Sequence, residues 1–277
     1  MISGKTARAT RIFGPIAGIV LRQFYLLRGS PVRVIPIVTW VAIDVLLWGF
    51  ITRYLNSVSG DGMDFVPTLL GGVLLWDFST RIMQGVSTAF LEDVWSRNFL
   101  NLFSSPLSIA EYLAGLVITS VLTSVIGVIV MVVLATGVFH LQFFSMGPPI
   151  AAFLLVLFAF GVSLGIFGSA IVLRLGPASE WLLWPLPALL SPFAAVFYPL
   201  AVLPRWMQWV SYALPPSYVF EGMRALLAGR PFPGDLLLKG ALVAVLELLL
   251  AAYFYARVYR HAVRTGLLAR YSAESVS

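Results

Sequence analysis

Ionisable side chains inside long apolar segments are the residues of this sequence best placed to do chemistry. Asp77 and Arg81 stand four positions apart, so a helix would place them on one face, within reach of an ion pair. Asp44 and Glu247 have no such partner in their own segments. Charges in an apolar helix are costly, so we expect these groups at a packed interface or on a transport pathway. Two interpretations of Asp77 and Arg81 stay open: an ion pair that lowers the cost of insertion, and a contact with a transported molecule.

The composition identifies the solvent that surrounds these side chains. Of 277 residues, 60% are hydrophobic and only 11% are charged, whereas soluble domains carry about 25% charged residues. A chain this apolar cannot form the polar shell of a soluble globule. We therefore predict an integral membrane protein, and we exclude a disordered chain, a coiled coil and an ordinary cytosolic enzyme.

Residue counts also limit the cofactors and partners. The chain has no cysteine and only two histidines, so it offers no disulfide, no thiolate chemistry and no histidine-rich metal site. The net charge of +6 fits basic loops beside anionic lipid better than a nucleic-acid partner. We expect membrane lipids as partners, no nucleic acid and no bound metal.

Six apolar segments are long enough to span a bilayer as helices. We predict an all-α integral membrane protein with a six-span transmembrane domain over 34–258. The predicted spans are about 34–51, 65–90, 112–141, 143–173, 181–203 and 236–258. In the fourth span, Gly161, Gly165 and Gly168 predict close helix packing.

The first 33 residues predict a cytoplasmic tail and an amphipathic helix on the membrane surface. Read as a helix that begins at Pro15, this region has an apolar stripe beside several basic residues. The alternative is an irregular cytosolic tail. The stripe consists of Ile16, Ile19, Val20, Phe24 and Leu27.

A shorter apolar stretch over 206–220 is interrupted by prolines. It has 15 residues, too few to span, with Pro204 before it and Pro215 and Pro216 near its end. We predict a re-entrant or interfacial hairpin over about 204–234, on the outer face. Trp206 and Trp209 are expected to anchor it at the membrane surface.

Basic residues predict the orientation of the chain. Six spans put both termini on one side, and that side then holds twelve of the 18 basic residues. The positive-inside rule therefore predicts cytoplasmic termini in the inner membrane, with a C-terminal tail over 259–277.

Three aromatic residues stand at helical spacing near the outer end of the predicted fifth span. Phe193, Phe197 and Tyr198 would lie on one face of a helix. Such a face can line a translocation path and stack on sugars or flat amphiphiles, or it can pack in the core. Both interpretations stay open.

The loop between the predicted second and third spans, about 91–104, resembles a short amphipathic helix. Glu92 and Asp93 stand at its start, where acidic residues favour a helix N-terminus. Trp95, Phe99 and Leu102 share one face. This helix would dock on a partner, or it would lie on the lipid headgroups.

Two stretches resemble the permeases of the type 2 ABC exporter family. The run 98–107, NFLNLFSSPL, is similar to that family's coupling-helix segment. The run 198–218, with Glu221-Gly222-Met223-Arg224 after it, is similar to the segment that follows the family's fifth span. One departure is the pair Pro215-Pro216, where Asn-Pro is common in the family.

This resemblance implies a transporter subunit without catalytic residues or a nucleotide-binding site of its own. Separate ATPase subunits would bind ATP and magnesium, and a second permease copy would complete a dimer. The ATPase contacts would come from Glu92, Asp93, Arg97 and Asn98. The translocation pathway would include Asp44, Asp77 and Arg81 together with the aromatic face. The substrate would be a lipid-linked glycan, a lipid or a hydrophobic compound.

Two other functions compete with this interpretation. A membrane-embedded enzyme acting on lipid phosphates would gather acids and arginines at one membrane face, whereas the acidic residues here are scattered along the chain. An ion-driven secondary transporter would carry broken helices in two related halves, and only one broken hairpin is evident.

Overall fold

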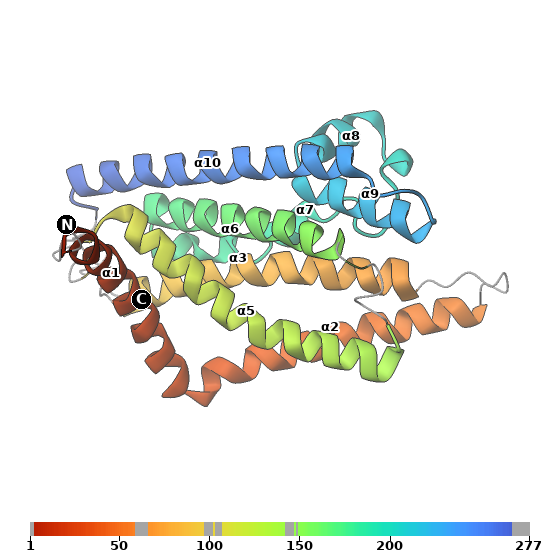
Figure 1. Ribbon diagram of the computed structural model, residues 1–277, viewed down its shortest axis with the longest axis horizontal. Helices are drawn as coiled ribbons and strands as arrows, with labels where there is room; N and C mark the ends of the chain where they lie inside the picture. Colours follow the sequence, from red (N-terminus) through yellow and green to blue (C-terminus); the bar gives the residue numbers. More distant parts are fainter. Residues whose placement is uncertain are drawn as a thin grey trace.

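The long helices of the protein lie side by side in a bundle. A computed structural model describes residues 3–58, 66–96, 102, 107–141, 147 and 149–267, and within these ranges it contains helices and no strands. The predicted all-α class is therefore confirmed. The bundle is built from α2 (Pro31–Val58), α3 (Gly71–Trp95), α5 (Ile109–Phe139), α6 (Pro149–Leu175) and α10 (Gly234–Arg264) (Figure 1).

Helix α6 lies at the centre of the packing, between α3 and α10. Gly161 and Gly165 face α3 so closely that a Cβ atom on Gly161 would lie 2.5 Å from the carbonyl oxygen of Ser79. This confirms the packing predicted for these two glycines. The third, Gly168, faces Leu183 instead.

Helices α5 and α2 cover the other side of α3. Helix α5 packs on α3 at Gly85, and Ser120 of α5 donates a hydrogen bond of 2.7 Å to the carbonyl oxygen of Ile82. Helix α2 packs chiefly on α5 and is the most exposed of the three. Its apolar side chains Trp40, Leu47 and Phe50 are more than half exposed, as expected for a lipid-facing or partner-facing helix.

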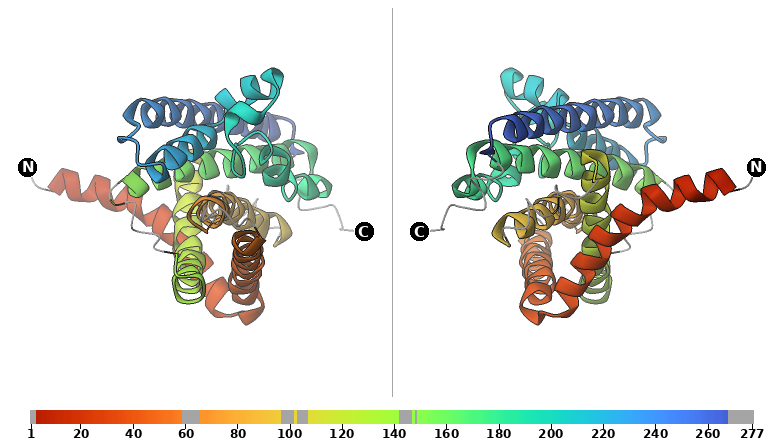
Figure 2. Two further views of the ribbon diagram at one scale, coloured as in Figure 1. Left: turned by 90° about the vertical axis from the view of Figure 1, so that its right-hand side faces the viewer. Right: turned by 90° about the vertical axis from the view of Figure 1, so that its left-hand side faces the viewer.

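Helix α1 (Ser3–Arg28) crosses one end of the bundle obliquely (Figures 1 and 2). The predicted start at Pro15 is wrong, because the residues before the proline are helical as well. Four residues of the predicted apolar stripe, Ile16, Ile19, Val20 and Leu27, lie on the less exposed side of α1. Ile19 is buried against Gly115 of α5 and Gln23 is buried, whereas Phe24 is 53% exposed.

Within the described ranges, four helices are long and apolar enough to cross a membrane: α2, α5, α6 and α10. They coincide with the predicted first, third, fourth and sixth spans. The predicted second span corresponds to α3, preceded by the short π-helix η1 (Val66–Leu70). The chain is thus a multi-pass membrane protein.

The predicted fifth span, 181–203, is not one helix. It contains the end of the 3-10 helix η3 (Pro177–Leu182), the five-residue helix α7 (Leu186–Leu190) and the short 3-10 helix η4 (Leu200–Val202), joined by turns. Prolines at 185, 187, 192 and 199 interrupt the segment, and each removes a backbone donor that a continuous helix needs. The six-span arrangement therefore remains a prediction.

Two short helices lie at the end of the bundle opposite α1 (Figure 1). They are α8 (Arg205–Tyr212) and α9 (Pro215–Leu227), and α9 packs on α10 and α6. Pro204 directly precedes α8, while Pro215 and Pro216 occupy the first turn of α9, where a missing backbone N–H costs little. The prolines therefore separate two helices, as the sequence predicts, and the re-entrant path in the membrane stays a prediction.

The beginning of α1 and the end of α10 lie at the same end of the bundle (Figure 1). This arrangement agrees with a chain whose termini share one side of the membrane. Which side that is remains a prediction from the basic residues.

Candidate functional site: a polar groove along helix α3

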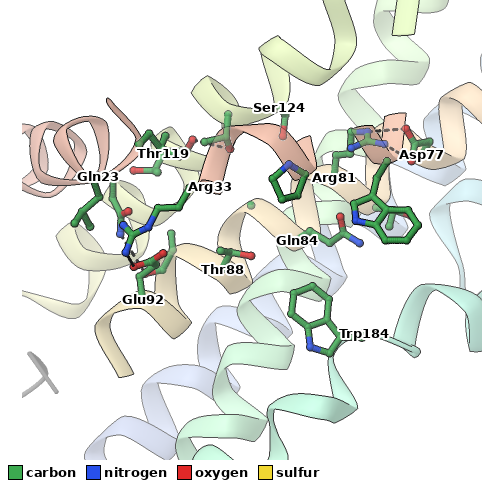
Figure 3. Close-up of a pocket in the computed structure, with 18 of the residues that line it drawn as sticks. Gln23, Arg33, Asp77, Arg81, Gln84, Thr88, Glu92, Thr119, Ser124 and Trp184 are labelled. Atoms are coloured by element: carbon green, nitrogen blue, oxygen red, sulfur yellow. Dashed lines mark hydrogen bonds and ion pairs between the residues drawn. The ribbon is translucent and has the colours of Figure 1, made fainter. Parts of the chain in front are cut away.

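A groove of about 690 Å³ opens beside α3. Its walls come from α1, α2, α3 and α5, and Trp184, between η3 and α7, contributes from outside these helices (Figure 3). The groove therefore joins the surface helix α1 to three helices of the bundle.

Helix α3 presents one polar face to this groove. The positions recur every three or four residues, which is the spacing of a single helical face. Between the first and the last of them the helix rises about 22 Å, most of the roughly 30 Å hydrocarbon core of a bilayer. The polar residues of this face, here named the α3 polar face, are Asp77, Thr80, Arg81, Gln84, Thr88 and Glu92.

One end of the groove contains the predicted ionisable residues. Arg81 donates to both carboxylate oxygens of Asp77, over 2.6 Å from Nε and 3.1 Å from Nη2. Both side chains are largely buried, so this bidentate pair is shielded from solvent. Asp44 of α2 lines the same groove and forms no hydrogen bond or ion pair among the described residues. The structure thus brings Asp44, Asp77 and Arg81 to one groove, and their role in a translocation pathway stays a prediction.

Two hydroxyl groups in the groove wall have no hydrogen-bond partner in the part of the chain that the structure describes. The oxygens of Thr80, on α3, and Ser124, on α5, are both buried and unpaired. Ser124 is only 5% exposed. A buried hydroxyl without a partner loses its hydration without compensation, so both groups gain from any ligand that supplies a hydrogen bond.

Paired side chains surround the last turn of α3, and two of them, Arg33 and Glu92, line the other end of the groove. Arg22 of α1 forms an ion pair with Asp93 of α3, and the Tyr112 hydroxyl of α5 donates to the same carboxylate over 2.8 Å. Nearby, Arg33 Nη2 and Glu92 Oε2 are 3.1 Å apart. We call these five residues the polar clamp, because they join α1, α2 and α5 to the last turn of α3.

These contacts correct the prediction for the loop after the second span. Glu92 and Asp93 belong to the last turn of α3, and they do not begin a separate helix. The Asp93 side chain is 0% exposed, so its carboxylate is engaged inside the chain. Trp95 is half exposed and donates a 2.7 Å hydrogen bond to Glu180. Arg97, Asn98 and Phe99 lie outside the described residues.

The three aromatic residues of the predicted fifth span do not share one face. Phe193 meets Trp206 edge to face, Phe197 stacks on Trp48, and the Tyr198 hydroxyl donates to the Pro192 carbonyl. Their spacing would align them only on a helix, and the backbone there is not helical. None of the three lines the groove.

Glu221 and Arg224, which stand three positions apart in the sequence, form a second polar contact at the opposite end of the bundle. Glu221 accepts hydrogen bonds from the Leu200 backbone over 2.7 Å and from Arg224 over 2.9 Å. Arg224 also donates to the carbonyl of Ala195, a residue with a left-handed φ of 56°. The pair thereby ties the non-helical segment before α8 to α9. In α8, Trp206 and Trp209 project outward, the latter 75% exposed.

Sequence reasoning missed the uncharged part of the groove. Thr80, Gln84 and Thr88 repeat at helical spacing inside an apolar segment, and that repeat was the available signal. Trp184, from the segment predicted as the fifth span, also lines the groove.

Apolar helices that can cross a membrane, with a polar groove beside them, define a multi-pass membrane protein of the transporter class. Comparison with protein families gives the same answer, since the ABC-2 type transporter family matches residues 20–228. The chain therefore belongs to the ABC-2 type transporter family, as its membrane permease component. The family's permeases work with ABC ATPase subunits, and the matched region contains no ATPase domain. No curated protein sequence matches the chain.

Proposed function

We propose that this permease exports an amphiphile, whose polar head moves along the α3 polar face while its apolar part stays in contact with lipid. The α3 polar face is the observation that carries the proposal. A polar face of this length would destabilise a purely hydrophobic core, because burying each polar group in an apolar environment costs free energy.

The composition of the groove supports a substrate with two unlike ends. The α3 polar face supplies hydroxyl, amide and charged groups, while Leu26, Leu27, Pro36 and Trp40 supply apolar walls. A lipid-linked glycan, another lipid or a hydrophobic compound with a polar group would all meet both kinds of surface.

The power for export would come from separate ATPase subunits that hold ATP and magnesium. We propose that they dock at the α1 end of the bundle, on the cytoplasmic side predicted by the basic residues, through Glu92, Arg97 and Asn98. Asp93 would act from inside, since the polar clamp connects the docking region to α1 and α5. Two permease copies would enclose the path, and the exposed α2 surface favours such pairing.

Cysteine labelling can test this proposal cleanly, because the natural chain contains no cysteine. Single cysteines at Gln84 and Thr88 would be introduced into the permease, purified together with its ATPase subunits. A membrane-impermeant maleimide should label both positions in the nucleotide-free complex. Trapping with ATP and vanadate should suppress the labelling, because closure moves the groove away from cytosolic water.

The matched control is a cysteine at Leu249, an exposed apolar position of α10 outside the groove. It should stay unlabelled in both states, because lipid covers it. The proposal fails if the groove cysteines resist the maleimide throughout, or if nucleotide trapping leaves their labelling unchanged.

A further inference from the structure

The charges that line the groove do not cancel. Five charged side chains line it, namely Arg33, Asp44, Asp77, Arg81 and Glu92. Arg81 is held by Asp77 and Arg33 by Glu92, so the carboxylate of Asp44 is left over. Figure 3 shows the two ion pairs at opposite ends of the groove. Among the described residues that line it, the groove therefore carries one negative charge in excess, which favours a cation.

Two tryptophan rings line the same groove as Asp44. Trp40 stands one helical turn before Asp44 on α2, lines the same groove and is 62% exposed. Trp184 lines the groove from outside the helices that form its other walls. Indole faces attract cations, and they attract ammonium groups most strongly where water is excluded.

Hydrogen-bond acceptors are also available in the wall. The buried hydroxyl oxygens of Thr80 and Ser124 have no partner. A hydroxyl oxygen accepts hydrogen bonds through two lone pairs, and a carboxylate only accepts. A primary ammonium group offers three N–H donors, whereas a quaternary ammonium group offers none.

From this combination we infer that the groove selects amphiphiles whose polar head carries one protonated amine, with Asp44 as the residue that determines this specificity. The inference rests on the proposed function and names the chemical class of its substrate. In the bound state the ammonium group donates to Asp44 and to the hydroxyls of Thr80 and Ser124. A phosphate or sulfate head is repelled by Asp44 and finds the guanidinium of Arg81 already engaged by Asp77.

The test measures binding of radiolabelled dodecylammonium at neutral pH to the permease–ATPase complex in phosphatidylcholine nanodiscs, with empty nanodiscs subtracted. Binding should saturate, and Asp44→Asn should weaken it by about tenfold or more, the size expected when a hydrogen bond to a charged group is lost. Asp235→Asn is the matched control: this exposed carboxylate on α10 lies outside the groove, and its loss should leave binding unchanged.

Three competitors with the same dodecyl chain define the head group. Dodecyltrimethylammonium should compete more weakly than dodecylammonium, and dodecyl maltoside and dodecyl sulfate weaker still. The double variant Thr80→Val, Ser124→Ala should reduce dodecylammonium binding about threefold and leave dodecyltrimethylammonium binding unchanged, a split that a folding defect would not produce.

Two results would overturn the inference. One is saturable binding of dodecyl maltoside or dodecyl sulfate that equals or exceeds that of the ammonium probe and does not depend on Asp44. In that case an amphiphile still occupies the groove, so the proposed function survives. The other is equal displacement of the probe by sodium or potassium ions, which would identify a simple cation site. Failure of the proposed function would be recognised separately, because the groove cysteines at positions 84 and 88 would then resist the maleimide.

Discussion

The polar clamp and the rest of the groove differ in whether their polar groups have hydrogen-bond partners. In the polar clamp, Asp93 is satisfied by a guanidinium and a phenol, and Glu92 pairs with Arg33. Elsewhere in the groove, the carboxylate of Asp44 and the hydroxyls of Thr80 and Ser124 have no hydrogen-bond partner among the described residues. A satisfied network fixes the helices that carry it, whereas unsatisfied groups raise the energy of the empty site and gain most from a ligand. The clamp is therefore suited to positioning, and the part of the groove that contains Asp44 is suited to binding.

Asp93→Ala gives the largest expected effect on stability. It leaves the guanidinium of Arg22 partly buried without its carboxylate and removes the acceptor of the Tyr112 hydroxyl. Breaking a buried pair in this way costs about 3–5 kcal/mol. Thermal unfolding of the purified permease should show a large drop in Tm, and a near-normal Tm would refute the positioning role. Asp235→Asn, at an exposed pair, is the control for loss of a carboxylate.

Glu92→Gln should lower Tm less than Asp93→Ala does. The two variants therefore compare the two carboxylates of the polar clamp directly. The pair with Arg33 is more exposed than the pair at Asp93. Exposed ion pairs contribute roughly 0–1 kcal/mol, so the Tm should change little. If Glu92 also contacts the ATPase, copurification of the ATPase subunit should fall while Tm stays constant. A Tm loss as large as that of Asp93→Ala would remove the distinction between these two carboxylates.

Asp44→Asn should change stability least, and in the opposite direction. The substitution removes a partly buried carboxylate that no described residue pairs, so we expect Tm to be unchanged or slightly raised, by less than about 1 kcal/mol in unfolding free energy. Loss of binding without loss of Tm would distinguish a binding residue from a structural one. A clear fall in Tm would mean that Asp44 supports Arg81 as the clamp residues support one another.

Some of this arrangement is readable from the sequence. Apolar length alone locates α2, α5, α6 and α10, and the glycine spacing at 161 and 165 indicates the close contact with α3. The i,i+4 spacing of Asp77 and Arg81 predicts their ion pair. These features depend on the regular geometry of a helix, so residue spacing in the sequence is enough to predict them.

Other features depend on distant partners or on competing signals. The ion pair of Asp93 joins residues 71 positions apart, and no local sequence pattern around Asp93 predicts Arg22 as its partner. The segment 181–203 has the hydrophobicity of a span, but its prolines prevent a continuous helix. Uncharged polar residues such as Thr88 were overlooked because they carry no charge, although their helical periodicity indicates the groove.

The ion pair between Arg22 and Asp93 has a consequence for how the chain is made. Helix α1 leaves the ribosome first, but the carboxylate that holds it emerges 71 residues later, and Tyr112 later still. The N-terminal helix therefore cannot make these contacts until α3 and the first turns of α5 have been synthesised. Shortening the chain from its N-terminus would leave Asp93 buried without a counter-charge in an otherwise inserted protein.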